Sequence, residues 1–187
     1  MMYLGSQFLV ANIAPYINSY FEDCTTAESQ TLLPIGTTVG MFSNFFGSLF
    51  FKRRLIHPKL FLLLFGSIGI SGFYFSSYCV SWTSFKYLFS ISLGLTGGST
   101  YMAAVSIAWQ YFPGKEGTIS GVIIGGFGIG SFLFTYLSTI LVNPKEVDSD
   151  MEALKPFPRE VAENLPHALR MLGICFYVIL ALSVILI

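Results

Sequence analysis

Long apolar stretches alternate with short polar connections along nearly the whole chain. The apolar stretches have no charged residue in their middle, because Asp, Glu, Lys and Arg fall in the connections or near the stretch ends. In lipid a spanning segment must satisfy its own backbone hydrogen bonds, so an apolar run of about 20 residues is a helix. The pattern predicts an all-α membrane protein with six transmembrane helices, at about 2–21, 31–51, 59–79, 84–111, 117–142 and 167–187.

One connection is longer than the others. Residues 143–166 combine four prolines with alternating charges, which makes them too polar to span a membrane and too rich in proline for one long helix. We expect a polar outer loop here, with a short surface helix around Val147–Leu154. The whole chain, residues 1–187, is predicted to form a single six-helix domain that includes this loop.

The composition supports the membrane interpretation. Hydrophobic residues make up 53% of the chain and charged residues 11%, whereas a soluble domain carries roughly a quarter charged residues. We therefore expect an integral, multi-pass protein whose main partner is the lipid bilayer; which membrane holds it is left open. A net charge of zero argues against nucleic acid, because phosphate binding needs a clustered basic excess.

The charge distribution predicts the orientation. Basic residues near helix ends are retained on the cytoplasmic side, and the second-to-third and fourth-to-fifth connections are basic. Their cytoplasmic basic residues are Lys52, Arg53, Arg54 and Lys115. Every acidic residue except Glu116 falls on the opposite side. Both termini are therefore expected on the cytoplasmic side.

Small residues recur at four-residue spacing within the predicted helices. Inside lipid, helices associate where small residues let their backbones approach closely. We expect helix packing or gating movements at these positions. The glycines assigned to this role are Gly94, Gly98, Gly117, Gly121, Gly126 and Gly130.

No pattern of catalytic or metal-binding residues is present. Cys24, Cys79 and Cys175 lie far apart without a CxxC spacing, so neither zinc nor a disulfide framework is indicated, although a bridge from Cys24 to Cys79 is left open. His57 and His167 lie at helix ends. Without paired carboxylates or a nucleophile with its base, an enzyme is not expected. No cofactor and no metal are predicted.

The stretch from Gly94 to Ser131 reads GLTGGSTYMAAVSIAWQYFPGKEGTISGVIIGGFGIGS. A helix with small residues on one face leads to Trp109 at the membrane interface, where amphipathic rings prefer to sit, and Pro113 and Gly114 then break it. This stretch resembles the fourth and fifth helices of the major facilitator superfamily, in the branch of monocarboxylate porters and oxalate:formate antiporters. The residues on that branch's positions are Tyr111, Phe112, Lys115, Gly121, Gly126 and Gly130.

Other positions depart from the family pattern. Within the same stretch these are Gly114, Glu116, Thr118, Ile119 and Ile123. In the motif between helices two and three, Gly47 is in place, but Phe51 stands at the family's Asp position and Arg54 at a Gly position. The helix-capping and gating role of that Asp is therefore not implied for this chain.

The resemblance implies a fold of two six-helix halves around a central cavity, with substrate near the midplane. The chain then corresponds to the N-terminal six-helix half of a secondary active transporter. The implied substrate is a small organic anion such as a monocarboxylate, moved by alternating access, and the implied partner is a second six-helix half or another copy. The alternative is a non-transporting membrane protein, or a truncated fragment, with an assembly or regulatory role.

Candidate cavity-lining residues follow from the same resemblance, which implies a cavity lined mainly by helices one and four. Asn12, Tyr16 and Ser19 fall within an arc of about 60 degrees on helix one, and Tyr101 follows small residues on helix four. Substrate-binding candidates are thus Asn12, Tyr16 and Tyr101. In the alternative interpretation, Asn12 hydrogen-bonds between helices and Tyr16 simply packs. Weaker candidates are Gln7 and Asn44.

Overall fold

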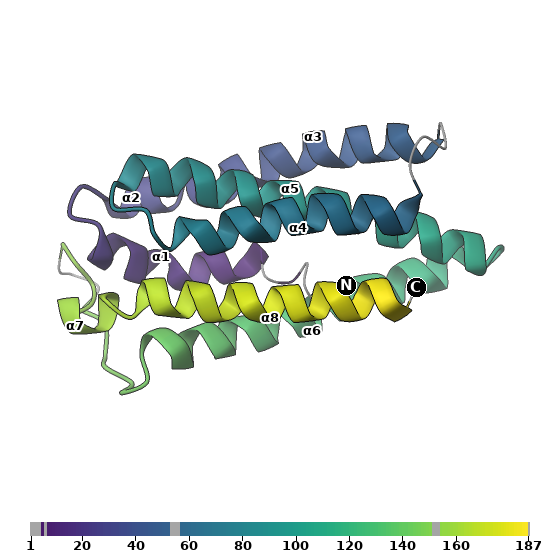
Figure 1. Cartoon of the computed structure of the whole chain (residues 1–187). Helices are drawn as coiled ribbons and strands as arrows, with labels where there is room; N and C mark the ends of the chain where they lie inside the picture. The colour runs from purple at the N-terminus through teal and green to yellow at the C-terminus, as the bar shows by residue number, and fades with distance from the viewer. Residues whose placement is uncertain (1–4, 6, 53–56, 151–153, 187) are drawn as a thin grey trace.

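The computed structural model describes residues 5, 7–52, 57–150 and 154–186, and all regular structure within these ranges is helical. The long helices run roughly along one common direction (Figure 1). They are α1 (Leu9–Tyr20), α3 (Leu32–Lys52), α4 (Pro58–Ser76), α5 (Trp82–Tyr111), α6 (Glu116–Val142) and α8 (Leu165–Leu186). Two single-turn helices, α2 (Thr26–Ser29) and α7 (Arg159–Ala162), lie in connections.

Four segments of the described chain are long and apolar enough to cross a bilayer. They are Lys59–Ser76, Trp82–Tyr111, Glu116–Val142 and Arg159–Ile185. The expected first span, 2–21, begins as α1 only at Leu9, and its 12 residues are fewer than the roughly 20 that a span needs; residues 1–4 and 6 lie outside the described ranges. Helix α3 has 21 residues but is not among these four segments. The helical membrane architecture is therefore confirmed, whereas six full spans are not.

Helix α5 lies between α3 and α4, and α8 packs against α4, while α1 packs mainly against α6 (Figure 1). A row of buried phenylalanines joins four of these helices. Phe73 of α4 lies 5.4 Å from Phe89 of α5 and 5.3 Å from Phe176 of α8, and Phe176 lies 5.0 Å from Phe134 of α6, measured between ring centroids. The rings exclude lipid from the middle of the bundle and set the distances between its helices.

Local sequence signals explain where several helices begin. The Ser81 hydroxyl accepts a hydrogen bond from the Ser84 amide at the start of α5, and the His57 ring accepts one from the Lys59 amide at the start of α4. Pro58 follows at the first helical position, where its missing N–H costs nothing. Such caps replace the hydrogen bonds that the first turn of a helix lacks.

The connections gather at two opposite ends of the bundle. The α1–α2, α4–α5 and α6–α7 connections lie at one end, which we call the outer end (Figure 1). The end of α3 and the α5–α6 turn lie at the other (Figure 1). Lys115 is exposed in that turn, where Gly114 has a φ of 80° that favours glycine. Lys52 ends α3, and Arg53 and Arg54 lie outside the described residues.

The long connection 143–166 differs from the expected loop. Residues 147–150 and 154 are not helical, and 151–153 lie outside the described ranges, so the helix expected around Val147–Leu154 was placed wrongly. The helical turn forms instead at α7, directly after Pro158. At the start of the connection the Asn143 side chain bonds both backbone groups of Val147. This turn holds Glu146 at a φ of 51° and ends α6.

Candidate functional site

Helices α3 and α5 touch through glycines. A side chain at Gly94 would place its Cβ 2.7 Å from the Val39 Cβ and 2.9 Å from the Gly40 amide nitrogen. A side chain at Gly98 would meet the Ser43 Cβ at 2.9 Å and the backbone of Gly40 as well. The Ser43 hydroxyl bonds the Leu95 carbonyl across the same contact, at 3.2 Å. Glycines at these positions therefore set the close approach and the relative rotation of the two helices.

A cavity of about 350 Å³ lies beside this contact. Residues from four segments enclose it: the turn before α1, the middle of α3, the middle of α5 and the first half of α6. The described lining residues are Gln7, Thr37, Gly40, Met41, Asn44, Gly97, Gly98, Tyr101, Ile123, Ile124 and Phe127. Its volume lies at the lower end of the range for small-molecule sites, which suits a compound of a few heavy atoms.

Gln7 reaches across the cavity wall onto α5. Its side-chain nitrogen lies 3.5 Å from the Leu93 carbonyl oxygen, a long hydrogen bond. A Cβ at Gly97 would lie only 2.7 Å from the Gln7 amide carbon. Gly97 thus makes room for the Gln7 side chain, so the chain before α1 and the middle of α5 are fitted to each other at the cavity.

Two further polar side chains face the cavity without a protein partner. The buried amide oxygen of Asn44 has no hydrogen-bond partner among the described residues. The Tyr101 hydroxyl, which also lines the cavity, forms no hydrogen bond with another residue in the described ranges. A buried polar group normally finds a partner, from protein, water or ligand. Asn44 and Tyr101 are consequently the groups of this cavity most available to bind a solute.

The remaining wall of the cavity is apolar. Met41 of α3 and Ile123, Ile124 and Phe127 of α6 supply it. The described lining contains no Asp, Glu, Lys, Arg or His. A small-molecule site typically combines an apolar wall with a small number of polar groups that point to the same place. This cavity offers a ligand hydrogen bonds, but no group of opposite charge.

Asn12 lies away from this cavity, in the contact between α1 and α6. Its amide nitrogen lies 3.0 Å from the hydroxyls of Ser138 and Thr139 and 3.3 Å from the Thr135 carbonyl. The arrangement is that of an interhelical polar contact, which in membrane proteins joins helices. Tyr101, by contrast, lines the cavity, together with the weaker candidates Gln7 and Asn44.

Tyr16 lies nearer the outer end. It is buried, and its ring stacks on Phe157 of the long connection, with ring centroids 4.2 Å apart. The Ser19 hydroxyl accepts a hydrogen bond from the Phe157 amide at 3.0 Å. The stripe on α1 therefore splits: Asn12 faces α6, whereas Tyr16 and Ser19 face the connection.

The glycines of α6 have two kinds of surroundings. A Cβ at Gly117 or Gly121 would meet nothing within 4 Å. Gly130 is buried and Gly126 is half-buried, and a Cβ at Gly5 would run into the α6 backbone between Phe127 and Ser131. The second half of α6 thus packs on the chain before α1, while its first half presents an open glycine face.

The cysteines and acidic residues form no metal or disulfide site within the described chain. Cys24, Cys79 and Cys175 are all free. No group of three His, Cys, Asp or Glu side chains is close enough to hold a metal ion among the residues described. The bridge from Cys24 to Cys79 that the sequence left open is therefore not formed in this structure.

Comparison with known proteins adds one informative relative. The chain is 25% identical over 127 residues to apicoplast pyruvate carrier 1 of Toxoplasma gondii, a match that covers 62% of this chain and 22% of the relative. The chain thus spans about a fifth of the length of that protein. No family model matches the chain. No solved structure matches it either.

These findings correct the assignment to the major facilitator superfamily. No model of that or any other family matches, and the relative is a pyruvate carrier matched at low identity over a small part of its length. The glycine spacing between Gly94 and Gly130 misled the sequence interpretation, because small residues at four-residue spacing occur wherever membrane helices pack closely. That the relative is a carrier agrees with the prediction that the chain is not an enzyme. Its apolar helices and this relative identify the chain as an integral, multi-pass membrane protein.

Proposed function

We propose that the chain is part of a membrane transporter for small organic acids, with pyruvate and similar monocarboxylates as its substrates. The observation that supports this most is the cavity between α3, α5 and α6, where the unpartnered side chains of Asn44 and Tyr101 converge with Gln7. The relative whose name states a pyruvate carrier supports the substrate class.

The chemistry of the cavity suits a short keto acid. A carboxylate and a keto oxygen accept hydrogen bonds, and the Tyr101 hydroxyl and the Asn44 amide nitrogen can donate them. The unpartnered Asn44 oxygen is itself an acceptor, so the acid binds the nitrogen of this amide and not its oxygen. The methyl group of such an acid fits the apolar wall of Met41, Ile123 and Phe127. The cavity then discriminates between pyruvate and longer acids by size. An acid with a longer apolar chain has to displace this wall, and packed walls resist added methylene groups.

An anion buried among neutral groups lacks a counter-charge, and burying an unpaired charge costs much free energy. The described lining has no cation, so we propose that one comes from a further helical part of the protein or from a second copy. A Cβ added at Gly117 or Gly121 on α6 would meet nothing within 4 Å. The open face of α6 beside Ile124 is the side from which such a partner approaches, and the cavity is exposed alternately to either side of the membrane as the two units move.

The proposal is tested by reconstituting the chain in liposomes, alone and with the longer protein's remaining segment where one exists, and following labelled pyruvate. We expect saturable uptake that competes with other short monocarboxylates. The substitution Tyr101→Phe removes one hydroxyl from the cavity. It is expected to raise the KM for pyruvate about tenfold, which corresponds to a loss of about 1.4 kcal/mol of binding free energy. The matched control is Tyr136→Phe, since Tyr136 is exposed on α6 outside the cavity.

Binding gives a second readout that needs no transport. A ligand that binds only the folded chain stabilises it by an amount that grows with the logarithm of its concentration above the Kd. Pyruvate is therefore expected to raise the Tm in detergent, and Asn44→Leu to abolish the rise. The carrier proposal would be contradicted if labelled pyruvate entered the reconstituted liposomes no faster than empty vesicles and if pyruvate left the Tm unchanged. The alternative of a non-transporting assembly role would then be the better explanation.

A further inference from the structure

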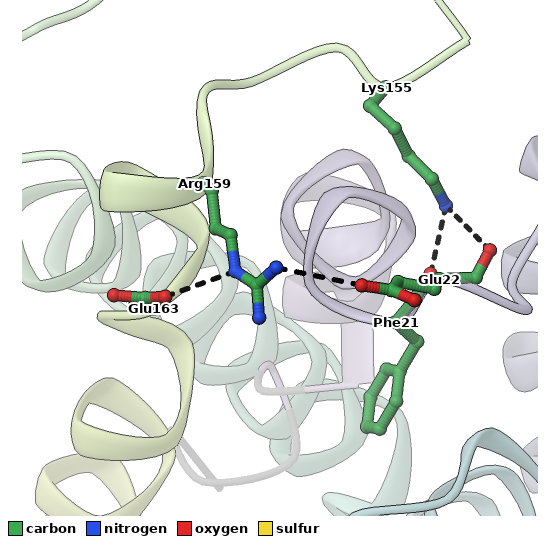
Figure 2. A network of polar contacts seen from close by, with 5 residues as sticks. All are labelled: Phe21, Glu22, Lys155, Arg159 and Glu163. Atoms are coloured by element: carbon green, nitrogen blue, oxygen red, sulfur yellow. Dashed lines mark hydrogen bonds and ion pairs between the residues drawn. The ribbon is translucent and has the colours of Figure 1, made fainter.

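The ammonium group of Lys155 sits in a cage of oxygens at the outer end of α1. It lies 2.7 Å from the Asn18 carbonyl, 2.8 Å from that of Phe21 and 2.9 Å from that of Cys24. The Glu22 carbonyl and the Asn18 amide oxygen follow at 3.3 Å each. Figure 2 shows the Lys155 side chain reaching the turn at Phe21 and Glu22 from the overlying connection.

The cage holds more oxygen acceptors than the Lys155 ammonium has N–H donors. An ammonium has three N–H donors, and five oxygens surround this one. Four of the five are carbonyls at the end of α1 and in the turn that follows, where the helix dipole is negative and the last carbonyls lack helical partners. Oxygen ligands gathered at the end of a helix are the surroundings that proteins offer to small cations.

Lys155 belongs to a segment that crosses the end of α1, which we call the strap (Leu154–Glu163). The strap is fastened at two further places. Phe157 stacks on Tyr16 and donates its amide to Ser19. Arg159 pairs with Glu22 at 3.5 Å and with Glu163 at 3.2 Å (Figure 2). The Arg159 and Glu22 side chains are 79% and 86% exposed, so that pair contributes little, and the Lys155 cage is the main polar fastening.

Cys24 lies at the Lys155 cage, and the accessibility of its thiol can be used to follow the opening of this end of the molecule. Its carbonyl is one of the cage oxygens, and its side chain is only 2% exposed. Burial raises the pKa of the Cys24 thiol to about 11, so little thiolate is present at neutral pH, and reagents reach the buried thiol only through local opening at the end of α1. The thiol is free, which makes it available as a native probe.

We propose that the outer end of α1 is a site for a monovalent cation, which the chain fills with its own Lys155 ammonium. While the ammonium is seated, the strap is latched over α1 and holds Tyr16 and the α1–α2 turn in place. When the ammonium leaves, the cage is open to a free cation of similar size, such as methylammonium or K⁺, and the strap is released. This site is separate from the cavity at Tyr101, and the inference does not depend on the proposed transport function.

The first test uses the unchanged protein. The chain in detergent is treated with an acylating reagent for amines, and the rate at each lysine is read by mass spectrometry of its peptides. Lys145 lies exposed in the same connection and is the internal control. A seated Lys155 is expected to react at least roughly tenfold more slowly than Lys145, since it reacts only through local opening. Equal rates at the two lysines would overturn the proposal.

The second test removes the tethered cation. In a background with Cys79→Ser and Cys175→Ser, the rate of Cys24 alkylation by a maleimide is measured with Lys155 present and in Lys155→Met. The replacement is expected to raise the rate about tenfold, because opening then costs about 1.4 kcal/mol less. The matched control is Arg159→Met, which removes the exposed ion pair and is expected to change the rate less than about twofold.

Free cations then distinguish an empty site from a damaged fold. Added methylammonium or K⁺ is expected to slow Cys24 alkylation in Lys155→Met back toward the original rate, whereas tetramethylammonium, which has no N–H donor and is too large for the cage, leaves it fast. Rescue by neither small cation, or equal rescue by tetramethylammonium at the same ionic strength, would refute the cation site. Because the lysine measurement needs no variant, it still tests whether the Lys155 ammonium is seated if Lys155→Met misfolds.

Discussion

The ring of Tyr16 in α1 stacks on the ring of Phe157 in the strap, with centroids 4.2 Å apart and ring planes 19° from parallel. Tyr16 is 5% exposed, so this contact is the apolar counterpart of the Lys155 cage one turn further along. Residues 141 positions apart in the sequence are thus joined by an aromatic pair and, beside it, by an ammonium on helix carbonyls. The long connection is therefore part of the bundle rather than a free loop.

This contact predicts a coupling energy between the two rings. We expect Phe157→Ala to lower the free energy of unfolding by about 2 kcal/mol, because a partly buried ring is lost. In a double-mutant cycle with Tyr16→Ala, the pairwise term is expected at about 0.5 to 1.5 kcal/mol. Denaturant unfolding in detergent, followed by circular dichroism, measures all four proteins. Strictly additive effects would mean that the stack contributes nothing beyond burial.

The glycines of α5 and α6 predict opposite effects of the same substitution. Gly94→Ala places a methyl group against Val39 and Gly40, and we expect a loss of about 1 to 3 kcal/mol from overpacking. Gly121→Ala meets nothing within 4 Å, and we expect a gain of about 0.5 to 1 kcal/mol from the higher helix propensity of alanine. Unfolding midpoints of the two variants test this. A loss at Gly121 as large as that at Gly94 would show that the open face of α6 is covered by another helix.

The Asn12 contacts predict a structural role for this side chain. Its amide bonds Ser138 and Thr139 across the α1–α6 contact, so Asn12→Ala is expected to cost about 0.5 to 1.5 kcal/mol of stability. In a cycle with Ser138→Ala the two losses should be less than additive, because they remove the same hydrogen bond. If instead Asn12→Ala left unfolding unchanged but abolished pyruvate uptake, Asn12 would belong to the substrate path.

The turn at α2 predicts a dependence of stability on acid pH. The Glu28 carboxylate accepts hydrogen bonds from the amide and the hydroxyl of Thr25, and these bonds lower the pKa of Glu28 below its usual value. Because the folded pKa is lower than the unfolded one, the stabilisation is complete above about pH 4.5 and is lost as the pH falls through the lowered pKa.

Thermal unfolding of the unchanged chain and of Glu28→Gln across this range measures the effect. We expect the original chain to be the more stable one at pH 7 and the difference to shrink as the pH falls below 4.5. Asp23→Asn is the matched control, since Asp23 is an exposed neighbour outside the cap. A difference independent of pH would mean that the cap works without the carboxylate charge.

Part of the candidate site can be predicted from the sequence alone. Tyr101, Gln7 and Asn44 could each be singled out as polar side chains in apolar stretches, and the structure brings these three together at one cavity. Asn12 and Tyr16 share one face of α1 in the sequence pattern, yet they contact α6 and the strap. Helix periodicity states which residues share a face, but not which neighbour that face meets.

Lys155 gave no signal in the sequence beyond being a charged residue among prolines. Its five oxygen partners come from a turn more than 130 positions earlier, and carbonyl oxygens have no sequence signature at all. The same holds for the cavity wall of Met41, Ile123 and Phe127, because apolar side chains in a membrane helix look alike whether they face lipid, another helix or a solute.

By itself, the sequence determined that this chain is helical and lies in a membrane, because lipid leaves an apolar run no other way to satisfy its backbone. It also determined where most helices begin and end, through local caps such as Ser81 and breaks such as Gly114. Only the tertiary structure decided that Tyr101 and Asn44 share a cavity and that Lys155 closes the end of α1. These relations depend on the rotation and separation of helices, which are set by the close contact of Gly94 with α3 and by the packing of Phe73, Phe176 and Phe134 between distant segments.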